Sequence, residues 1–405
     1  MADNSNRTHA QNNRQAGKAK AGIGKTFLIS NRQSSAIIAS TLIGVGVLTL
    51  PRESANAAGE SAWLAALGGG LISMVGMAII VKLSNRYPGQ SIVEYAASVF
   101  GPANRPLIGR LLSFPIFLAL FLFWGTSTAL VARTFGEVVI TTVLTKTPLE
   151  VIISSMLITA FVFVMYDEEV LARVNEILLP IIVIPVLVIA LSSLQSARLD
   201  NFLPVFDGNW GGLLKSMYTT STSYLGFEMM AIFFAKAELS DKRMSGSLVG
   251  IAIPSFIYVL IVVSGISVFG VEEMQLLAWP TLELVKTTEV PGLILERLES
   301  AFLGVWVAAV FTSVGNMYFA TAIVARQAFK LRTHRWIAVC LLPIIYWLSL
   351  IPPNIQKLFE FQKWSGQIGI ILAFVVPALL LLISLLRKQR GNSGGSRKEA
   401  NRPHE

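Results

Sequence analysis

Long apolar segments recur along almost the whole chain, from Ser34 to Leu386, with short charged stretches between them. Each segment holds about 20 residues, enough for a helix to cross the roughly 30 Å hydrocarbon layer of a membrane. Of the 405 residues, 14% are charged and 53% hydrophobic, whereas about a quarter of the residues in an average soluble domain are charged. The repetition excludes a single buried core helix and predicts an all-α integral membrane protein.

Ten such spans are expected, and their boundaries follow the apolar runs. They cover residues 34–57, 61–83, 110–141, 148–166, 169–194, 211–236, 245–270, 293–326, 336–352 and 365–387. With ten spans, 24 of the 33 Lys and Arg residues fall on the side that both termini share. Because cytoplasmic loops carry the excess of Lys and Arg, this side is predicted to be cytoplasmic. The outer side carries glutamates instead, among them Glu53 and Glu60.

Polar, basic segments flank the apolar region at both ends of the chain. Residues 1–28 are rich in Asn, Gln, Ala and Gly and hold no apolar core of a signal peptide, and residues 388–405 are similar in character. We expect two disordered cytoplasmic tails on either side of a ten-helix transmembrane domain, residues 29–387. The positive charge lies in tails and short loops without an aromatic-interleaved basic face, so no nucleic-acid partner is expected.

Residue types that serve enzymes are scarce in the spans. The three histidines are His9, His334 and His404, in the tails and one loop, and the one cysteine is Cys340, in an apolar run. No span therefore offers a pair of histidine ligands, a histidine base or a disulfide framework. Nucleotide-binding and nucleophile motifs are also missing from the sequence. We expect neither an enzyme nor a bound cofactor.

Two spans share an unusual glycine-containing interruption. The first is broken at Gly44, Val45 and Gly46 and ends at Pro51, and the sixth is interrupted at Tyr224, Leu225 and Gly226. Corresponding interruptions five spans apart predict an inverted five-helix repeat with discontinuous helices 1 and 6 and a midplane binding site between them. The N–H and C=O groups of an unwound turn can hold both ends of a zwitterion. Close helix packing is the alternative use of such small residues.

Polar and aromatic residues near these interruptions are further candidates. Glu228 follows the second interruption and lies among apolar residues, where an acid usually faces a cavity and has a functional partner; a locally paired cap of the half-helix is the alternative. Helix 8 presents Thr312 and Asn316 one turn apart, with interhelical hydrogen bonding as the alternative role. Helix 3 presents Phe121, Trp124 and Gly125, a face suited either to an organic side chain or to packing.

Short motifs follow one another in a fixed order from Ile29 to Leu386. They are Ile29-Ser30 with Gln33, Gly44-Val45-Gly46 with Leu50-Pro51, Tyr87-Pro88-Gly89, Ile92-Val93-Glu94-Tyr95 with Gly101, Leu203-Pro204, Tyr224-Leu225-Gly226-Phe227-Glu228, Trp279-Pro280-Thr281-Leu282-Glu283-Leu284 and Glu296-Arg297-Leu298-Glu299. In this order and spacing the sequence resembles the B subunits of spore germinant receptors, a branch of the amino acid-polyamine-organocation transporter superfamily.

This resemblance implies a ten-helix inverted-repeat fold in the inner membrane of a spore and partnership with germinant receptor A and C subunits. It implies that the chain senses a small-molecule germinant such as an amino acid. The ligand site would comprise Gly44, Val45, Gly46, Phe121, Trp124, Gly125, Tyr224, Leu225, Gly226, Phe227, Glu228, Thr312 and Asn316. By likeness to sodium-coupled members, a cation site is hypothesised at the carbonyls of Ser40 and Ile43 and the hydroxyls of Thr312 and Ser313.

Three classes of function remain open from the sequence. A receptor subunit would pass a ligand-induced population shift to partner subunits. An ion-coupled amino acid transporter would use the same site with alternating access. A passive pore or a scaffold that holds partners is the third class. Contact of the basic tails with anionic membrane lipid is compatible with each of them.

Overall fold

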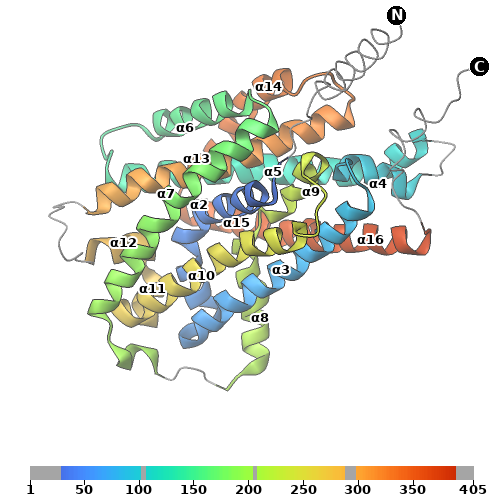
Figure 1. Cartoon of the computed structure of the whole chain (residues 1–405). Helices are drawn as coiled ribbons and strands as arrows, with labels where there is room; N and C mark the ends of the chain where they lie inside the picture. Colours follow the sequence, from blue (N-terminus) through green and yellow to red (C-terminus); the bar gives the residue numbers. More distant parts are fainter. Residues whose placement is uncertain (1–28, 102–105, 204–207, 288–297, 389–405) are drawn as a thin grey trace, which may run out of the picture.

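The computed structural model describes residues 29–101, 106–203, 208–287 and 298–388 (Figure 1). Helices make up nearly all of this part, and its one β contact is an isolated bridge between Ile29 and Ala237. The predicted all-α class is confirmed. The expected tail 1–28, the tail 388–405 apart from Lys388, and the first residues of the predicted span 293–326 lie outside the described residues.

The helices follow the predicted spans closely. The first half comprises α2 (Asn31–Ala58), η1 (Gly59–Ser61), α3 (Ala62–Arg86), α4 (Ile92–Phe100), α5 (Pro106–Thr142), α6 (Leu149–Val164), α7 (Glu168–Ser193), η2 (Leu194–Ser196) and η3 (Leu199–Phe202). The second half comprises α8 (Trp210–Thr220), η4 (Ser221–Tyr224), η5 (Phe227–Met229), α9 (Met230–Phe233), η6 (Phe234–Lys236), α10 (Arg243–Phe269), α11 (Val271–Leu276), α12 (Pro280–Thr287), α13 (Leu298–Ala328), α14 (Arg335–Leu350), α15 (Ile355–Ile370), the π-helical turn η7 (Ile371–Val375) and α16 (Val376–Leu386).

Six helical stretches of the described residues are long and apolar enough to cross a membrane. They are Gly46–Arg86, Leu107–Thr142, Glu168–Ser196, Arg243–Phe269, Glu299–Ala328 and Ile355–Leu386. Two further apolar helices, Leu149–Val164 and Arg335–Leu350, have 16 residues each, below the roughly 17 to 25 that a span needs. The predicted span 211–236 is divided among short elements. The chain is thus a multi-pass helical protein, and the count of ten stays a prediction.

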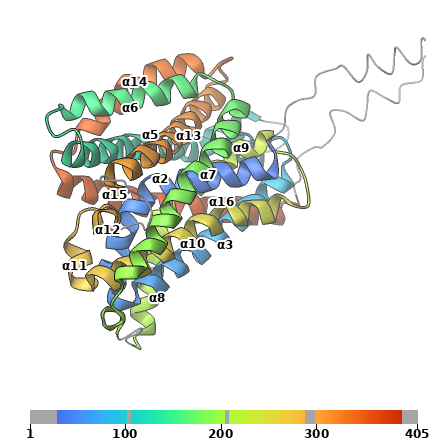
Figure 2. The same cartoon turned by 60° about the vertical axis from the view of Figure 1, so that its left-hand side comes forward.

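Helices α2 and α13 form the centre of the bundle. Helix α2 packs against α10, α13, α7, α3 and α8, and most of the apolar stretch of α13 is buried inside the protein. Helices α6 and α14 pack together at one edge of the bundle (Figures 1 and 2). The lipid-facing positions of the outer helices hold exposed apolar side chains such as Val151, Ile184 and Phe256. Such exposure suits a protein whose outer surface meets hydrocarbon rather than water.

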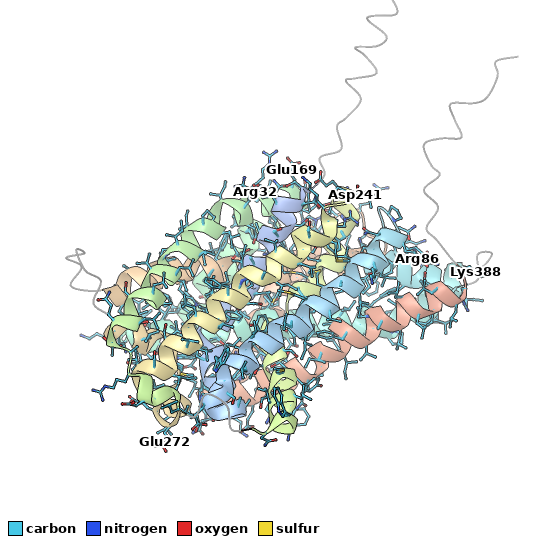
Figure 3. All side chains as sticks on the ribbon, turned by 60° about the horizontal axis from the view of Figure 1, so that its bottom comes forward. Arg32, Arg86, Glu169, Asp241, Glu272 and Lys388 are labelled. Atoms are coloured by element: carbon cyan, nitrogen blue, oxygen red, sulfur yellow. The ribbon has the colours of Figure 1, made fainter. Side chains whose placement is uncertain are left out.

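The two ends of the bundle are marked by charged side chains (Figure 3). Arg32 and Asp241 lie at one end, and Glu272 lies at the opposite end. Helix α2 begins next to Arg32, at Ser30, whose hydroxyl accepts a hydrogen bond from the Gln33 N–H in a capping box. The helix therefore runs from the first end toward the end that Glu272 marks.

The predicted interruption of helix 1 and its predicted end at Pro51 are both wrong, because α2 is a continuous helix from Asn31 to Ala58 with Pro51 inside it. Its glycines serve close packing instead. A Cβ on Gly44 would lie 2.0 Å from Ser313 Oγ, and one on Gly46 would lie 2.1 Å from the Tyr258 hydroxyl. Glycine at these two positions lets α13 and α10 approach α2 more closely than any other residue would. The packing alternative is the correct one here.

The predicted interruption of helix 6 is confirmed. Helix α8 ends at Thr220, Leu225 is extended, and Gly226 has φ 122° and ψ −26°, a conformation that favours glycine. Short 3₁₀ and α-helical turns then continue to Lys236. This break lies against α2, since a Cβ on Gly226 would lie 3.0 Å from Thr41 Cγ2.

Candidate functional site

A cavity of about 460 Å³ lies between α2, α5, the α8–η4 segment, α13 and α15. Its size is within the roughly 300 to 1,000 Å³ range of small-molecule sites. It is lined by Thr41, Leu42, Gly46, Thr49, Arg52, Glu53, Asn56, Ala57, Phe123, Ser127, Leu130, Val131, Thr219, Thr222, Ser223, Leu225, Ala278, Ser313, Met317, Phe359, Gln362, Lys363, Ser365 and Gly366. The cavity therefore joins the two helices predicted to carry a ligand, helices 1 and 6.

Burial changes along the cavity from one end to the other. Thr41, Ser313 and Met317 are buried and form its floor, whereas Asn56 and Lys363 are exposed at its rim. Because α2 runs from the Arg32 end of the bundle toward the Glu272 end, the rim faces the Glu272 end (Figure 3). A molecule entering from that end would meet the charged rim first and the buried floor last.

Three of the predicted residues line this cavity: Gly46 and Leu225 of the ligand set and Ser313 of the cation set. Gly226 lies directly beneath them, within contact distance of Thr41 and Met317. Tyr224 points away, and its hydroxyl donates to the Ala66 carbonyl at 2.7 Å. The helix-6 break thus contributes backbone and one leucine side chain to the cavity.

The other members of the predicted ligand set whose side chains are described do not line the cavity. Phe227 packs edge-on against Phe374, with ring centroids 5.7 Å apart. Gly44 faces Ser313, and Gly125 faces Thr321. The described members outside the lining are Gly44, Phe121, Trp124, Gly125, Tyr224, Gly226, Phe227, Glu228, Thr312 and Asn316. The side chain of Val45 is not described.

Glu228 is buried and is held by two of the predicted residues. Trp124 Nε1 donates to its carboxyl at 2.9 Å, and the N–H of Gly226 donates at 2.7 Å. The carboxyl therefore caps the turn at Gly226 and ties it to α5. The structure brings the candidates of helix 3 (α5) and helix 6 together as a support of the break behind the cavity, which matches the alternative of a locally paired cap for Glu228.

A buried polar network lies below the cavity floor. Asn316 Nδ2 donates to Thr41 Oγ1 at 2.8 Å and to Asn175 Oδ1 at 2.8 Å, and Asn175 Nδ2 donates to Asn316 Oδ1 at 2.9 Å. The Ser40 hydroxyl donates to Asn175 Oδ1. The network joins α2, α7 and α13. Sequence reasoning missed Asn175, although a lone asparagine within an apolar span was the available signal.

The hypothesised cation set is partly assembled. Ser313 Oγ lies 3.2 Å from the Ser40 carbonyl and 2.8 Å from the Thr41 carbonyl, and donates to these oxygens. The Thr312 hydroxyl donates to the Ala309 carbonyl of its own helix at 2.8 Å. Ile43 is buried nearby in α2. Among the described residues no group of three or more His, Cys, Asp or Glu side chains could hold a metal.

Charged side chains in the cavity were also missed. Arg52 and Glu53 lie inside α2, rather than in an outer loop where Glu53 was expected, and two charges within the predicted span 34–57 were the signal. Ser223 donates a hydrogen bond to the Glu53 carboxylate. Arg52 Nε donates to the Gln275 carbonyl at 3.2 Å, and its guanidinium lies 4.6 Å from the Phe359 ring centroid.

The sequence matches the family model described as "Spore germination protein" over residues 28–358. The chain belongs to the spore germination protein family. Spore germination protein YndE of Bacillus subtilis (strain 168) is 30% identical over 365 residues, which are 90% of this chain and 98% of YndE. Spore germination protein GerLB of Bacillus cereus is 24% identical over 371 residues, 90% of this chain and 96% of GerLB. The predicted family resemblance is confirmed.

Solved transporters share the fold of this family member. MhsT in complex with L-phenylalanine gives a TM-score of 0.60 at 12% identity, covering 88% of this chain and 97% of MhsT. Mhp1, a nucleobase-cation-symport-1 family transporter in a closed conformation with bromovinylhydantoin bound, gives 0.56 at 14% identity, covering 90% and 96%. The likeness confirms the predicted transporter-like helical fold. Family and fold are of the transporter and receptor type rather than the enzyme type.

Proposed function

We propose that this chain is the nutrient-sensing subunit of a spore germinant receptor. It binds a small germinant, an amino acid, in the cavity between α2, α13 and the helix-6 break, and it triggers germination through partner A and C subunits. The observation that carries the proposal is a ligand-sized cavity at a helix break in a member of the spore germination protein family. Family membership supports a role in germination, and the cavity supports this place as the binding site.

The broken helix provides a means of passing the signal on. Leu225 touches the cavity, and the next residue, Gly226, is fixed by Glu228 and Trp124. A ligand that contacts Leu225 acts on this turn directly. If the turn has two arrangements, a ligand that binds one of them more tightly shifts the population toward it. The predicted site residues outside the cavity lining act in this proposal as supports of the turn and the floor.

The proposal includes the setting of the protein. The chain would lie in the inner membrane of the spore with both termini cytoplasmic, so that the cavity rim faces outward from the cytoplasm. The tails 1–28 and 388–405 would then be cytoplasmic segments beside a transmembrane domain of residues 29–387. The excess of Lys and Arg on the side of the termini supports this orientation.

An ion-coupled amino acid transporter is the alternative. Two observations favour it: the fold likeness to Mhp1 and MhsT, and the position of Ser313 against the Ser40 and Thr41 carbonyls. In this alternative a cation held by Ser40, Ile43, Thr312 and Ser313 would couple its own movement to that of the solute. Both functions use the same cavity, so occupancy of the cavity by itself does not separate them.

The test of the proposed function is to fill the cavity. Val131 lines it from α5, and Val131→Trp would occupy space that a ligand needs. Val151→Trp is the matched control, since Val151 is exposed on α6 and outside the cavity lining. Each variant is placed in spores that lack the wild-type subunit, its level is checked by immunoblot, and germination is titrated against the common amino acids.

A receptor predicts a shift of the Val131→Trp response to higher amino acid concentrations, or its loss, with an unchanged response for Val151→Trp. Equal responses in both variants would contradict a germinant site in this cavity. The transporter alternative is tested with the purified chain in liposomes. Solute uptake that depends on an ion gradient and that Val131→Trp abolishes would establish transport, and its absence would favour sensing.

A further inference from the structure

Two opposite charges in the cavity have no ion-pair partner within the described part of the protein. Glu53 lines the cavity from α2 and Lys363 lines it from α15, and neither takes part in an ion pair with another described residue. The one hydrogen bond given to the Glu53 carboxylate comes from the Ser223 hydroxyl. A carboxylate has about four acceptor positions, so most of its capacity is unused.

The cation next to Glu53 in the sequence is engaged elsewhere. Arg52 directs its Nε to the Gln275 carbonyl of α11 and lays its guanidinium over the Phe359 ring of α15. Its charge therefore helps fix the rim of the cavity and does not form an ion pair with Glu53. A carboxylate in the membrane-embedded part of a helix usually faces a cavity and pairs with a cation.

Apolar side chains form one part of the remaining cavity wall, alongside hydroxyl and amide side chains. Phe123, Leu130 and Val131 line it from α5, with Met317 of α13 and Leu225 of the helix-6 break. Among the described residues of the lining, Glu53 is the one with an acidic side chain. A ligand with a cationic side chain would need a second anion, and one with an anionic side chain would face that same carboxylate.

We infer that Glu53 binds the ammonium group and Lys363 the carboxylate of a zwitterionic α-amino acid whose uncharged, apolar side chain packs against the α5 wall. This inference rests on the proposed function for its ligand class and adds the anchoring residues and the selectivity. Glu53 and Lys363 lie on different helices, α2 and α15, so a bound zwitterion bridges two walls of the cavity. Ligand binding thereby connects α2 to the outer helix α15.

The test measures binding to the purified full-length chain, reconstituted in lipid nanodiscs, by isothermal titration calorimetry. The twenty common L-amino acids are screened first, and an apolar one is expected to bind tightest. The tightest binder is then compared with its deaminated carboxylic acid and with its carboxamide. Charge-assisted hydrogen bonds contribute about 1.5 to 3 kcal/mol, so loss of either charged end is expected to weaken binding roughly 10- to 150-fold.

Charge-removing variants assign the two ends. Glu53→Gln keeps the size of the side chain and an acceptor for the Ser223 hydroxyl. It is expected to weaken binding of the amino acid by the same roughly 10- to 150-fold and to leave binding of the deaminated acid unchanged. Lys363→Gln is expected to weaken binding of the amino acid but not binding of its carboxamide. Glu60→Gln in η1 and Lys357→Gln in α15 are the matched controls outside the cavity lining, and both should bind as wild type does.

Three results would overturn the inference: tightest binding of a charged-side-chain amino acid, no binding of any amino acid, or equal weakening of the amino acid and its deaminated analogue by Glu53→Gln. Unchanged thermal unfolding of each variant excludes misfolding as the cause. Germination assays separate this inference from the proposed function. If amino acid binding depends on Glu53 but spores that lack the chain germinate normally, only the receptor role is refuted. If germination depends on the chain but amino acid binding does not depend on Glu53, only the role of Glu53 as an anchor is refuted.

Discussion

Replacement of Gly226 by alanine should disturb both the stability of the bundle and the response to ligand. Gly226 has φ 122° and ψ −26°, which a residue with a Cβ adopts only under strain. Backbone strain of this kind costs about 1 to 3 kcal/mol. The new methyl group would also lie 3.0 Å from Thr41 Cγ2 and 3.4 Å from Met317 Cε, two residues of the cavity floor.

Two other glycines provide controls that separate strain from crowding. Gly208 has φ 79°, and no atom would lie within 4 Å of a Cβ at this position, so Gly208→Ala should show the effect of backbone strain alone. Gly304 lies within α13 and also has nothing within 4 Å. Since alanine favours a helix over glycine by about 1 kcal/mol, Gly304→Ala should be neutral or stabilising.

The assay is thermal unfolding of the purified chain in detergent, followed by the germination titration in spores. The entropy of unfolding grows with chain length, by about 2.1 cal/mol/K per residue, so a loss of 1 kcal/mol lowers the melting temperature of a chain of this size by only about 1 °C. Gly226→Ala is therefore expected to lower the melting temperature by roughly 1 to 4 °C, and Gly208→Ala by less. Gly226→Ala should also shift the ligand response at an unchanged protein level, because the cavity floor moves. If Gly226→Ala were as stable as Gly304→Ala and gave the same germination response, the claim that the helix-6 break requires glycine at position 226 would be refuted.

Further predictions concern the floor and its supports. Asn175→Leu leaves Asn316 Oδ1 without its donor and should lower the free energy of unfolding by about 1 to 3 kcal/mol, measured by thermal or denaturant unfolding. Trp124→Phe removes the donor to Glu228 and should cost about 0.6 to 1.7 kcal/mol in the same assay. If the cation hypothesis holds, ligand binding to the wild-type chain should be stronger in sodium than in choline chloride, and Ser313→Ala should abolish that difference. Wild-type binding that ignores sodium would contradict it.

Much of the helical layout could be predicted because hydrophobic length decides it. Segments such as 110–141 and 245–270 coincide with α5 and α10 to within a few residues. The break of helix 6 was also predictable, because Gly226 adopts a positive φ that few other residues accept. The family signature adds order and spacing that composition alone does not contain.

The continuity of α2 could not be predicted, because a glycine in a helix has two opposite uses. Gly44 and Gly46 suit an unwound turn, and they also suit a helix that two neighbours approach closely. The choice depends on Ser313 and Tyr258, whose hydroxyls occupy the space of the missing side chains. Those contacts bring together segments more than 200 residues apart in the sequence, so no local pattern reports them.

The ligand set differed from the cavity lining for a related reason. Trp124 and Glu228 are a polar pair in an apolar setting, which the sequence marks as unusual without saying whether a ligand or another side chain completes it. In the structure they complete each other. The charged residues at the rim, Arg52 and Glu53, follow Pro51 and resemble the start of a loop, but the helix continues through Ala58 with Pro51 inside it.

The contacts around α2 explain how one cavity could serve a sensor. Thr41 contributes to the cavity floor and its hydroxyl accepts a hydrogen bond from Asn316, which is bonded in turn to Asn175 of α7. Glu176, the next residue of α7, forms an ion pair with Arg32 in the first turn of α2, with 3.0 Å between Glu176 Oε1 and Arg32 Nε. A ligand that displaces Thr41 must therefore disturb donors and acceptors that join three helices, because buried polar groups tolerate few unmatched partners. In a transporter these bonds would have to break and reform in every cycle, whereas in the proposed receptor a single rearrangement passed to α7 would be sufficient.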